Sequence, residues 1–139
     1  MADFRIHRRV QFAETDMAGV LHFANYYRFM EEVEHAFWRS VELSVMSHDG
    51  GRALGWPRVA TRCEHFAPVR FEEEVELVLR VASVSDRSVS YDIEFRSEDR
   101  RIALGRITAV CCAMGDRGFQ PVSIPPAFRK RLDELQSDA

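Results

Sequence analysis

The residues best suited to chemistry in this chain are Asp16 and Gly19, in a short loop that precedes a long amphipathic segment. Residues 12–38 read FAETDMAGVLHFANYYRFMEEVEHAFW. A glycine permits a tight turn between Asp16 and the segment that follows. The first turn of a helix exposes unpaired N–H groups and carries partial positive charge. Such groups polarise a carbonyl oxygen, and a neighbouring carboxylate suits acyl transfer as nucleophile or as base to water.

Typical magnitudes indicate what the helix end would contribute. Its electrostatic effect on an exposed carboxylate is only about 0.3–1 kcal/mol, whereas removing one well-aimed oxyanion donor costs about 2.7–4 kcal/mol. We therefore expect the helix amides to act as an oxyanion hole more than as a means of shifting a pKa. The spacing alone leaves a second interpretation open, in which Asp16 only caps the helix or a turn.

The segment after the loop has the period of a helix. Its apolar residues recur at i, i+4, i+7 and i+11, and polar residues occupy the other side. This pattern predicts a helix from about Phe23 to about Val41. The apolar stripe consists of Tyr26, Met30, Val33 and Phe37, and the polar side of Arg28, Glu32, His35 and Arg39.

The rest of the chain reads as strands and a closing helix. Residues 74–81 and 88–95 alternate apolar and mostly polar side chains, as half-buried strands do. Residues 47–57, SHDGGRALGWP, read as a loop, and Pro125-Pro126 starts a short closing helix. Further strands are expected at 4–12, 59–69 and 102–114, the last apolar on both faces as a central strand is.

These elements predict the fold class and the assembly. One long helix against five antiparallel strands gives an α+β fold of one sheet layer and one helix layer. The 139 residues are expected to form a single domain, residues 1–139. A five-stranded sheet has two edges, and pairing them between subunits would hide them. We therefore expect a homo-oligomer.

Charge and composition exclude some classes of function. A net charge of −3 and a pI near 6.0 argue against general nucleic-acid or membrane-surface binding. No apolar run reaches membrane-spanning length and no secretory leader opens the sequence, so the expected location is the cytoplasm. The cysteines and histidines lack metal-ligand spacing, which favours reduced, buried thiols and no metal. The cysteines are Cys63, Cys111 and Cys112.

Three stretches resemble one known family. TDMAGVLHFANYYRFMEE is similar to the signature of the 4-hydroxybenzoyl-CoA thioesterase family of hotdog-fold enzymes. HFAPVRFEEEVEL and PVSIPPAFRKRL resemble later segments of that family, so the likeness covers nearly the whole chain. It implies a five-stranded antiparallel sheet wrapped around one long central helix, with a short C-terminal helix. It also implies homodimers that often pair into homotetramers, and hydrolysis of acyl-CoA without metal or cofactor.

The resemblance also implies roles for individual residues. Asp16 matches the family's catalytic carboxylate, and Phe23 matches the position whose backbone N–H polarises the thioester carbonyl. Gly19 keeps the turn open. His22 has two interpretations: it hydrogen-bonds Asp16 or the substrate carbonyl, or it packs against the loop. Tyr26 and Glu31 match positions on the helix that we assign first to packing and orientation.

Substrate binding has weaker sequence signals. Arg87 and Ser88 resemble the family's turn at the fourth strand, whose side chains contact the CoA nucleotide. The acyl group is expected along the helix beside Tyr26, Tyr27 and Met30 at a subunit interface. A second branch of hotdog thioesterases uses a helix carboxylate, which makes Glu31 and Glu34 reserve candidates.

Two alternative functions remain open at this level. The chain can be a hotdog enoyl-CoA hydratase or dehydratase that uses Asp16 and His22, or a non-catalytic acyl-CoA-binding module. The sequence does not choose the acyl group, the nucleophilic or general-base route, or the dimer over the tetramer.

Overall fold

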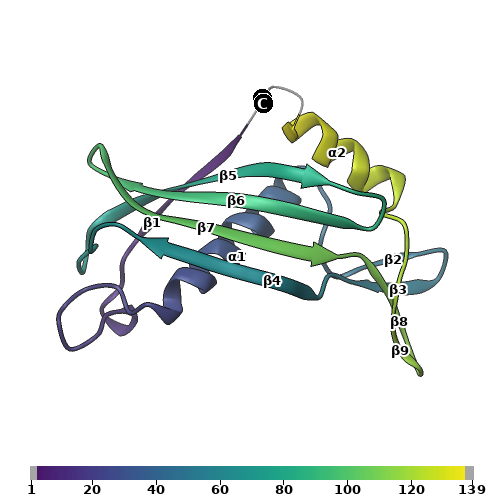
Figure 1. The fold of residues 1–139 in the computed structure, drawn as a ribbon, viewed down its shortest axis with the longest axis horizontal. Helices are drawn as coiled ribbons and strands as arrows, with labels where there is room; N and C mark the ends of the chain where they lie inside the picture. The colour runs from purple at the N-terminus through teal and green to yellow at the C-terminus, as the bar shows by residue number, and fades with distance from the viewer. Residues whose placement is uncertain (1–2, 137–139) are drawn as a thin grey trace.

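The computed structural model describes residues 3–136 and contains two sheets and two α-helices (Figure 1). The larger sheet is antiparallel, with five strands in the order β1-β5-β6-β7-β4. In this sheet β1 pairs with β5 and β4 pairs with β7, so β1 and β4 are its edges. The strands are β1 (Phe4–Arg9), β4 (Arg58–His65), β5 (Glu74–Val84), β6 (Ser88–Ser97) and β7 (Arg100–Val110).

The long helix α1 (Ala24–Ser40) lies across one face of this sheet (Figure 1). Its predicted apolar stripe is buried, because each of the four side chains is at most 5% exposed. The helix approaches β7 closely at Gly105, where a Cβ atom would collide with the end of the Met30 side chain. Glycine at that position lets helix and strand pack against each other.

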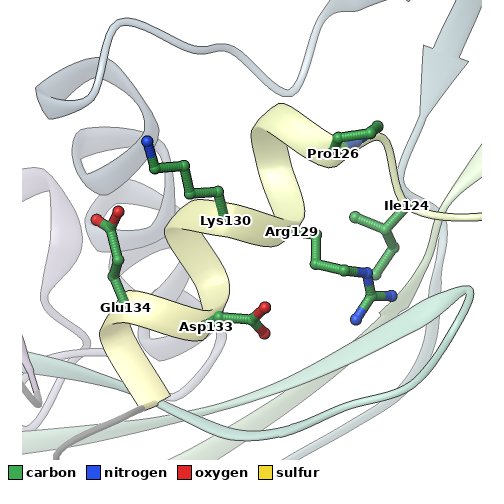
Figure 2. A pocket seen from close by; sticks show the side chains of 6 residues that line it. All are labelled: Ile124, Pro126, Arg129, Lys130, Asp133 and Glu134. Atoms are coloured by element: carbon green, nitrogen blue, oxygen red, sulfur yellow. The ribbon is translucent and has the colours of Figure 1, made fainter.

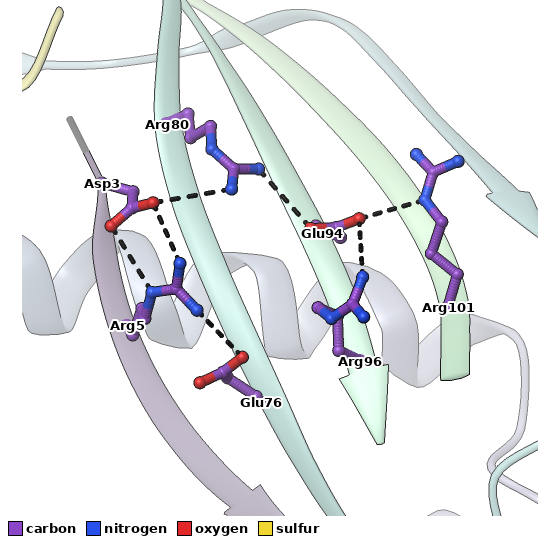
Figure 3. A network of polar contacts seen from close by, with 7 residues as sticks. All are labelled: Asp3, Arg5, Glu76, Arg80, Glu94, Arg96 and Arg101. Carbon is purple, nitrogen blue, oxygen red and sulfur yellow. Dashed lines mark hydrogen bonds and ion pairs between the residues drawn. The ribbon is translucent and has the colours of Figure 1, made fainter. Parts of the chain in front are cut away.

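The central strand β6 shows why this sheet has one apolar and one polar face. Its side chains alternate between buried and half-buried along the whole strand, as a period of two requires. The inner set faces α1, and the charged residues of the outer set form ion pairs; those of Glu94 and Arg96 belong to a network that crosses β1, β5, β6 and β7 (Figure 3). The inner residues of β6 are Val89, Tyr91, Ile93 and Phe95.

A second, four-stranded sheet in the order β2-β3-β8-β9 corrects two predictions. Residues 47–57 were expected to be a loop, but they contain the hairpin β2 (Ser47–Asp49) and β3 (Arg52–Gly55). The strand predicted at 102–114 divides into β7 and β8 (Cys112–Gly115), and β9 (Gly118–Pro121) pairs with β8. Strands of three or four residues are too short to show a period, and the continuous apolar run at 109–114 hides the break at Cys111.

The remaining elements follow the predictions with small shifts. The first strand ends at Arg9 rather than residue 12, because residues Phe12–Glu14 form a 3-10 turn closed by a Gln11–Glu14 capping box. The closing helix α2 (Pro126–Gln136) buries Phe128 beside Trp38 and Trp56. None of the helices in residues 3–136 combines the length and apolar character that a bilayer crossing requires.

Candidate active site

The loop before α1 is held in a closed shape by its own backbone. The Asp16 amide donates to the Val20 carbonyl at 2.9 Å, and the Gly19 amide donates to the Asp16 carbonyl at 3.0 Å. Thr15 and Leu21 form an antiparallel bridge at its base. Gly19 has φ of +79° with open space around it, so backbone conformation, not crowding, favours glycine there.

The Asp16 carboxylate is exposed and uses its two oxygens differently. Oδ1 accepts hydrogen bonds from the Ala18 amide at 2.9 Å and the Val20 amide at 3.4 Å. Oδ2 accepts none from the residues that the structure describes. One oxygen therefore fixes the side chain to the loop, and the other is open to water or a ligand.

The helix begins with one unused amide. The Ala24 amide donates to His22 Nδ1 at 3.1 Å, and the Asn25 amide donates to the His22 carbonyl at 2.9 Å. Phe23 occupies the N-cap position, and within residues 3–136 its own N–H has no acceptor. His22 therefore serves the helix start, while the Phe23 amide is free to donate to a bound oxygen.

Asp16, Gly19, His22 and Phe23 line one open depression of about 1100 Å³. Its walls carry apolar side chains that are unusually exposed, among them Phe12 (76%) and Phe23 (69%). Solvent-facing aromatic rings around a carboxylate are typical of a ligand site or an interface. Sequence reasoning missed Phe12, Met17 and Phe71, which read there as ordinary loop and strand residues.

Tyr26 and Glu31 lie outside this depression. Tyr26 is buried, edge-on to the His65 ring with centroids 4.5 Å apart, and packs on Phe95. Burial raises the pKa of Tyr26 to about 12, with smaller contributions from Cys63 and from the Asp16 charge. Glu31 is exposed on α1, 3.9 Å from the Arg58 guanidinium. Within one chain, these two residues support the helix that presents the site.

Arg87 and Ser88 lie in the β5–β6 turn, at the opposite end of the sheet from the Asp16 loop (Figure 1). Strand β5 runs from the Asp16 end of the sheet to this turn. It has eleven residues and therefore spans about 35 Å. Ser88 Oγ contacts Ser85 Oγ at 2.6 Å, and Arg87 Nε lies 3.6 Å from Asp86 Oδ2. One chain alone does not bring this pair to the depression.

A separate depression of about 700 Å³ lies along α2 (Figure 2). Its one guanidinium, from Arg129, is turned toward the β5–β6 turn and donates to the Ser85 carbonyl at 2.5 Å. Within residues 3–136, no set of three His, Cys, Asp or Glu side chains is arranged to hold a metal. The Asp16 depression is thus the better candidate for chemistry.

Comparison with known proteins places these observations in a family. The family model described as thioesterase-like superfamily matches residues 10–132. A candidate esterase of Aquifex aeolicus is 30% identical over 124 residues, which cover 88% of this chain and 91% of that protein. A 1,4-dihydroxy-2-naphthoyl-CoA hydrolase of Synechocystis is 26% identical, over 90% of this chain and 92% of its own.

Solved structures agree in architecture. A gentisyl-coenzyme A thioesterase has a TM-score of 0.77 at 26% identity, over 93% of this chain and 99% of its own. The 1,4-dihydroxy-2-naphthoyl-CoA thioesterase of Synechocystis has the same fold, with a TM-score of 0.85 at 23% identity, over 96% of this chain and 97% of its own. The predicted α+β hotdog fold is confirmed.

Proposed function

The chain belongs to the thioesterase-like superfamily, and from that premise we propose that it hydrolyses an acyl- or aryl-CoA to the free acid and CoA. The predicted enzyme class, a thioester hydrolase, agrees with the family and with the names of two relatives that act on aryl-CoA thioesters.

One observation supports the proposal most: Asp16, which has a carboxylate oxygen without a partner in residues 3–136, and Phe23, whose amide has none there either, line the same depression. In our proposal, the thioester carbonyl lies between Asp16 and Phe23. The Phe23 N–H and the helix end stabilise the oxyanion that develops as the carbonyl carbon becomes tetrahedral. The apolar walls hold the acyl group and exclude part of the water, which strengthens that hydrogen bond.

Two routes fit this arrangement. As general base, Asp16 takes a proton from water, and the water oxygen bonds to the carbonyl carbon. As nucleophile, Asp16 bonds to that carbon itself and forms an anhydride that water then cleaves. In both routes the C–S bond breaks with its electron pair on sulfur. A thiolate leaves readily compared with an alkoxide, so no strong acid is needed.

His22 has a supporting role in this proposal. Its Nδ1 accepts the Ala24 amide, and its ring stacks on Phe23 with centroids 4.7 Å apart. Both contacts orient the start of α1 and therefore the Phe23 N–H. No hydrogen bond joins Asp16 to His22 in the described part of the chain, so a hydratase that uses them as a pair gains no support.

The rest of the site is proposed to come from a second copy of the chain. Edge β4 is open over eight residues and exposes Val59, whereas edge β1 has only six residues. Antiparallel pairing of two β4 strands would form a homodimer, which can pair into a tetramer. The Arg87–Ser88 turn of a partner is then available to the CoA phosphates, to which arginine is well suited.

The test is a thiol-release screen across short, long and aromatic acyl-CoAs, with Asp16→Asn as the decisive variant. Asparagine keeps an Oδ1 acceptor for the Ala18 and Val20 amides, so the loop should stay folded. We expect turnover to fall by about 10²-fold or more, as for loss of a general base. Asp116→Asn, at an exposed turn far along the chain, is the matched control.

The outcomes separate the candidate functions. Equal rates for the parent and Asp16→Asn on the best acyl-CoA would rule out the assigned role of Asp16. When an enoyl-CoA is the substrate, loss of its enoyl absorbance without thiol release would favour a hydratase. Tight acyl-CoA binding with no thiol release at any chain length would favour a binding module.

A further inference from the structure

Strand β1 turns one charged side chain toward the helix. Its alternation places Phe4 and Ile6 against the core, and Arg8 is the next residue in the same phase. The Arg8 side chain is only 19% exposed. A guanidinium in that environment requires partners for its donors. It finds two carboxylates, one in the Asp16 loop and one on α1.

The first carboxylate belongs to Glu14, two residues before Asp16. Arg8 Nη1 donates to Glu14 Oε1 at 3.0 Å, and Arg8 Nη2 donates to the other oxygen. The Glu14 main chain is bonded too, because its carbonyl accepts the His22 amide at 2.9 Å and Asn25 Nδ2 at 2.8 Å. Glu14 thus ties the two ends of the loop together, with Asp16 on one side and Phe23 on the other.

The second carboxylate belongs to Glu32, on the third turn of α1. Arg8 Nε donates to Glu32 Oε1 at 2.7 Å, and Nη2 reaches Oε2 at 3.2 Å. The guanidinium also lies 4.4 Å from the centroid of the Phe29 ring, a cation–π contact. The planar fork of arginine meets both carboxylates and the ring at once, which the single ammonium of lysine cannot do.

We propose that Arg8 is a positioning residue for the active site, acting through Glu14 and Glu32 to fix Asp16 relative to the Phe23 amide. This inference rests on the proposed thioesterase function. Asp16 belongs to the loop that Glu14 closes, and Phe23 belongs to the helix that Glu32 holds. Arg8 links these two carboxylates, in addition to the bonds that the His22 amide and Asn25 Nδ2 make to the Glu14 carbonyl, so its loss loosens the hold on the carboxylate and the oxyanion donor. Displacements of about 1 Å reduce catalysis by about 10²-fold.

The experiment compares Arg8→Lys and Glu32→Gln with Arg5→Lys. Arg5 lies on the same strand and pairs with Asp3 and Glu76 on the outer face, away from the loop, which makes it a matched control. We expect Arg8→Lys to lower kcat at least tenfold, about 1.4 kcal/mol in the barrier, with KM within threefold of the parent. Glu32→Gln should lower kcat in the same way but less, and Arg5→Lys should match the parent.

Rescue and stability separate positioning from plain folding. Arg8→Ala is assayed below its Tm with added ethylguanidinium or ethylammonium, and only the planar guanidinium should restore kcat. Rates that stay equal to the parent's in Arg8→Lys and Glu32→Gln would overturn the proposal. So would a Tm loss that accounts for all the lost activity, or equal rescue by the two cations.

Hydrogen exchange tests the inference even if the parent hydrolyses no thioester. In Arg8→Lys, amides of residues 14–26 should exchange faster than in the parent, while those of β6 and β7 keep their protection. Unchanged exchange in residues 14–26 would refute the role of Arg8. Absence of turnover in the parent, together with faster exchange of residues 14–26 in Arg8→Lys, would refute the thioesterase function but support the positioning role of Arg8.

Discussion

At the scale of single residues, the site depends on groups that leave part of their bonding capacity unused. Asp16 commits Oδ1 to its own loop and leaves Oδ2 open, and Phe23 begins a helix with a free amide. Their neighbours are saturated, because Glu14 accepts bonds at both carboxylate oxygens and at its carbonyl. Saturated neighbours keep the open groups in place, which is the preorganisation that oxyanion stabilisation requires.

Glu14 predicts a pH dependence of stability. Burial alone would raise the pKa of Glu14, but hydrogen bonds from Arg8 and the Gln11 amide lower it below the ordinary 4.5. A carboxyl whose folded pKa is lowered stabilises the protein above its unfolded pKa and loses this contribution as the pH falls through the folded pKa. We therefore expect Glu14→Gln to be less stable than the parent at pH 7, with the difference closing in acid below about pH 4.5.

Urea unfolding at pH 7 and at decreasing acid pH values measures this difference. Asp116→Asn, at the exposed turn between β8 and β9, is the control. Burial alone would raise the pKa of Glu73, but Ser97, the Arg70 amide and Arg100 lower it, so Glu14→Gln should keep part of the parent's acid sensitivity. A parent–variant difference that stays constant with pH would contradict the assignment.

At the scale of elements, α1 is fixed to both edges of the large sheet. Arg8 joins it to β1, and Glu34 joins it to β4 through two hydrogen bonds with Arg58, one of 3.0 Å. Glu34 is 1% exposed, while the Arg58 side chain is 25% exposed. This placement makes Glu34, a reserve candidate for catalysis, a structural partner of the edge strand.

The unequal burial of this pair predicts unequal costs. Arg58→Met leaves a buried carboxylate without its partner and should destabilise by about 3–5 kcal/mol. Glu34→Met leaves a guanidinium that can turn to water, so it should cost less. The double variant should be nearly as stable as the parent, because matched apolar side chains can replace a buried ion pair. Urea unfolding of the parent, the two single variants and the double variant gives the four free energies of unfolding of a double-mutant cycle. Equal losses of stability in the two single variants would disprove the burial argument.

At the scale of the whole molecule, the two faces of the large sheet have different roles. The inner face holds the core and α1. The outer face carries a network in which Glu94 is shared by three arginines, at 3.0 to 3.6 Å (Figure 3). Exposed ion pairs contribute only about 0–1 kcal/mol each. Their effect is to keep this face polar, which leaves the β4 edge as the better surface for self-association. The network comprises Asp3, Arg5, Glu76, Arg80, Glu94, Arg96 and Arg101.

The proposed assembly predicts the mass and activity of an edge variant. Light scattering after size exclusion should give at least twice the 16.1 kDa of one chain. Val59 is 61% exposed on β4, so Val59→Lys should place like charges across the proposed strand pair and shift the protein toward monomer. We expect thiol release to fall in parallel with the dimer fraction. A parent that is monomeric and fully active would exclude a site completed by a second chain.

The sequence by itself determined the features that depend on neighbours along the chain. The stripe on α1, the alternation in β5 and β6 and the turn at Gly19 follow from periods and backbone preferences within about a dozen residues. The membership of Asp16, Gly19, His22 and Phe23 in one loop and helix start could be predicted for the same reason. Their catalytic roles remain predictions that the proposed experiments test.

Only the tertiary structure decided which distant segments meet. The small sheet depends on pairing β3 with β8, whose short strands carry no period of their own. Arg8 reaches Glu32 across 24 positions, as Arg58 reaches Glu34. Such contacts form because burial forces charged groups to find partners wherever the fold brings them. The depression around Asp16 is decided in the same way, since the Phe71 ring packs edge-on against the Phe12 ring there only after β5 pairs with β1.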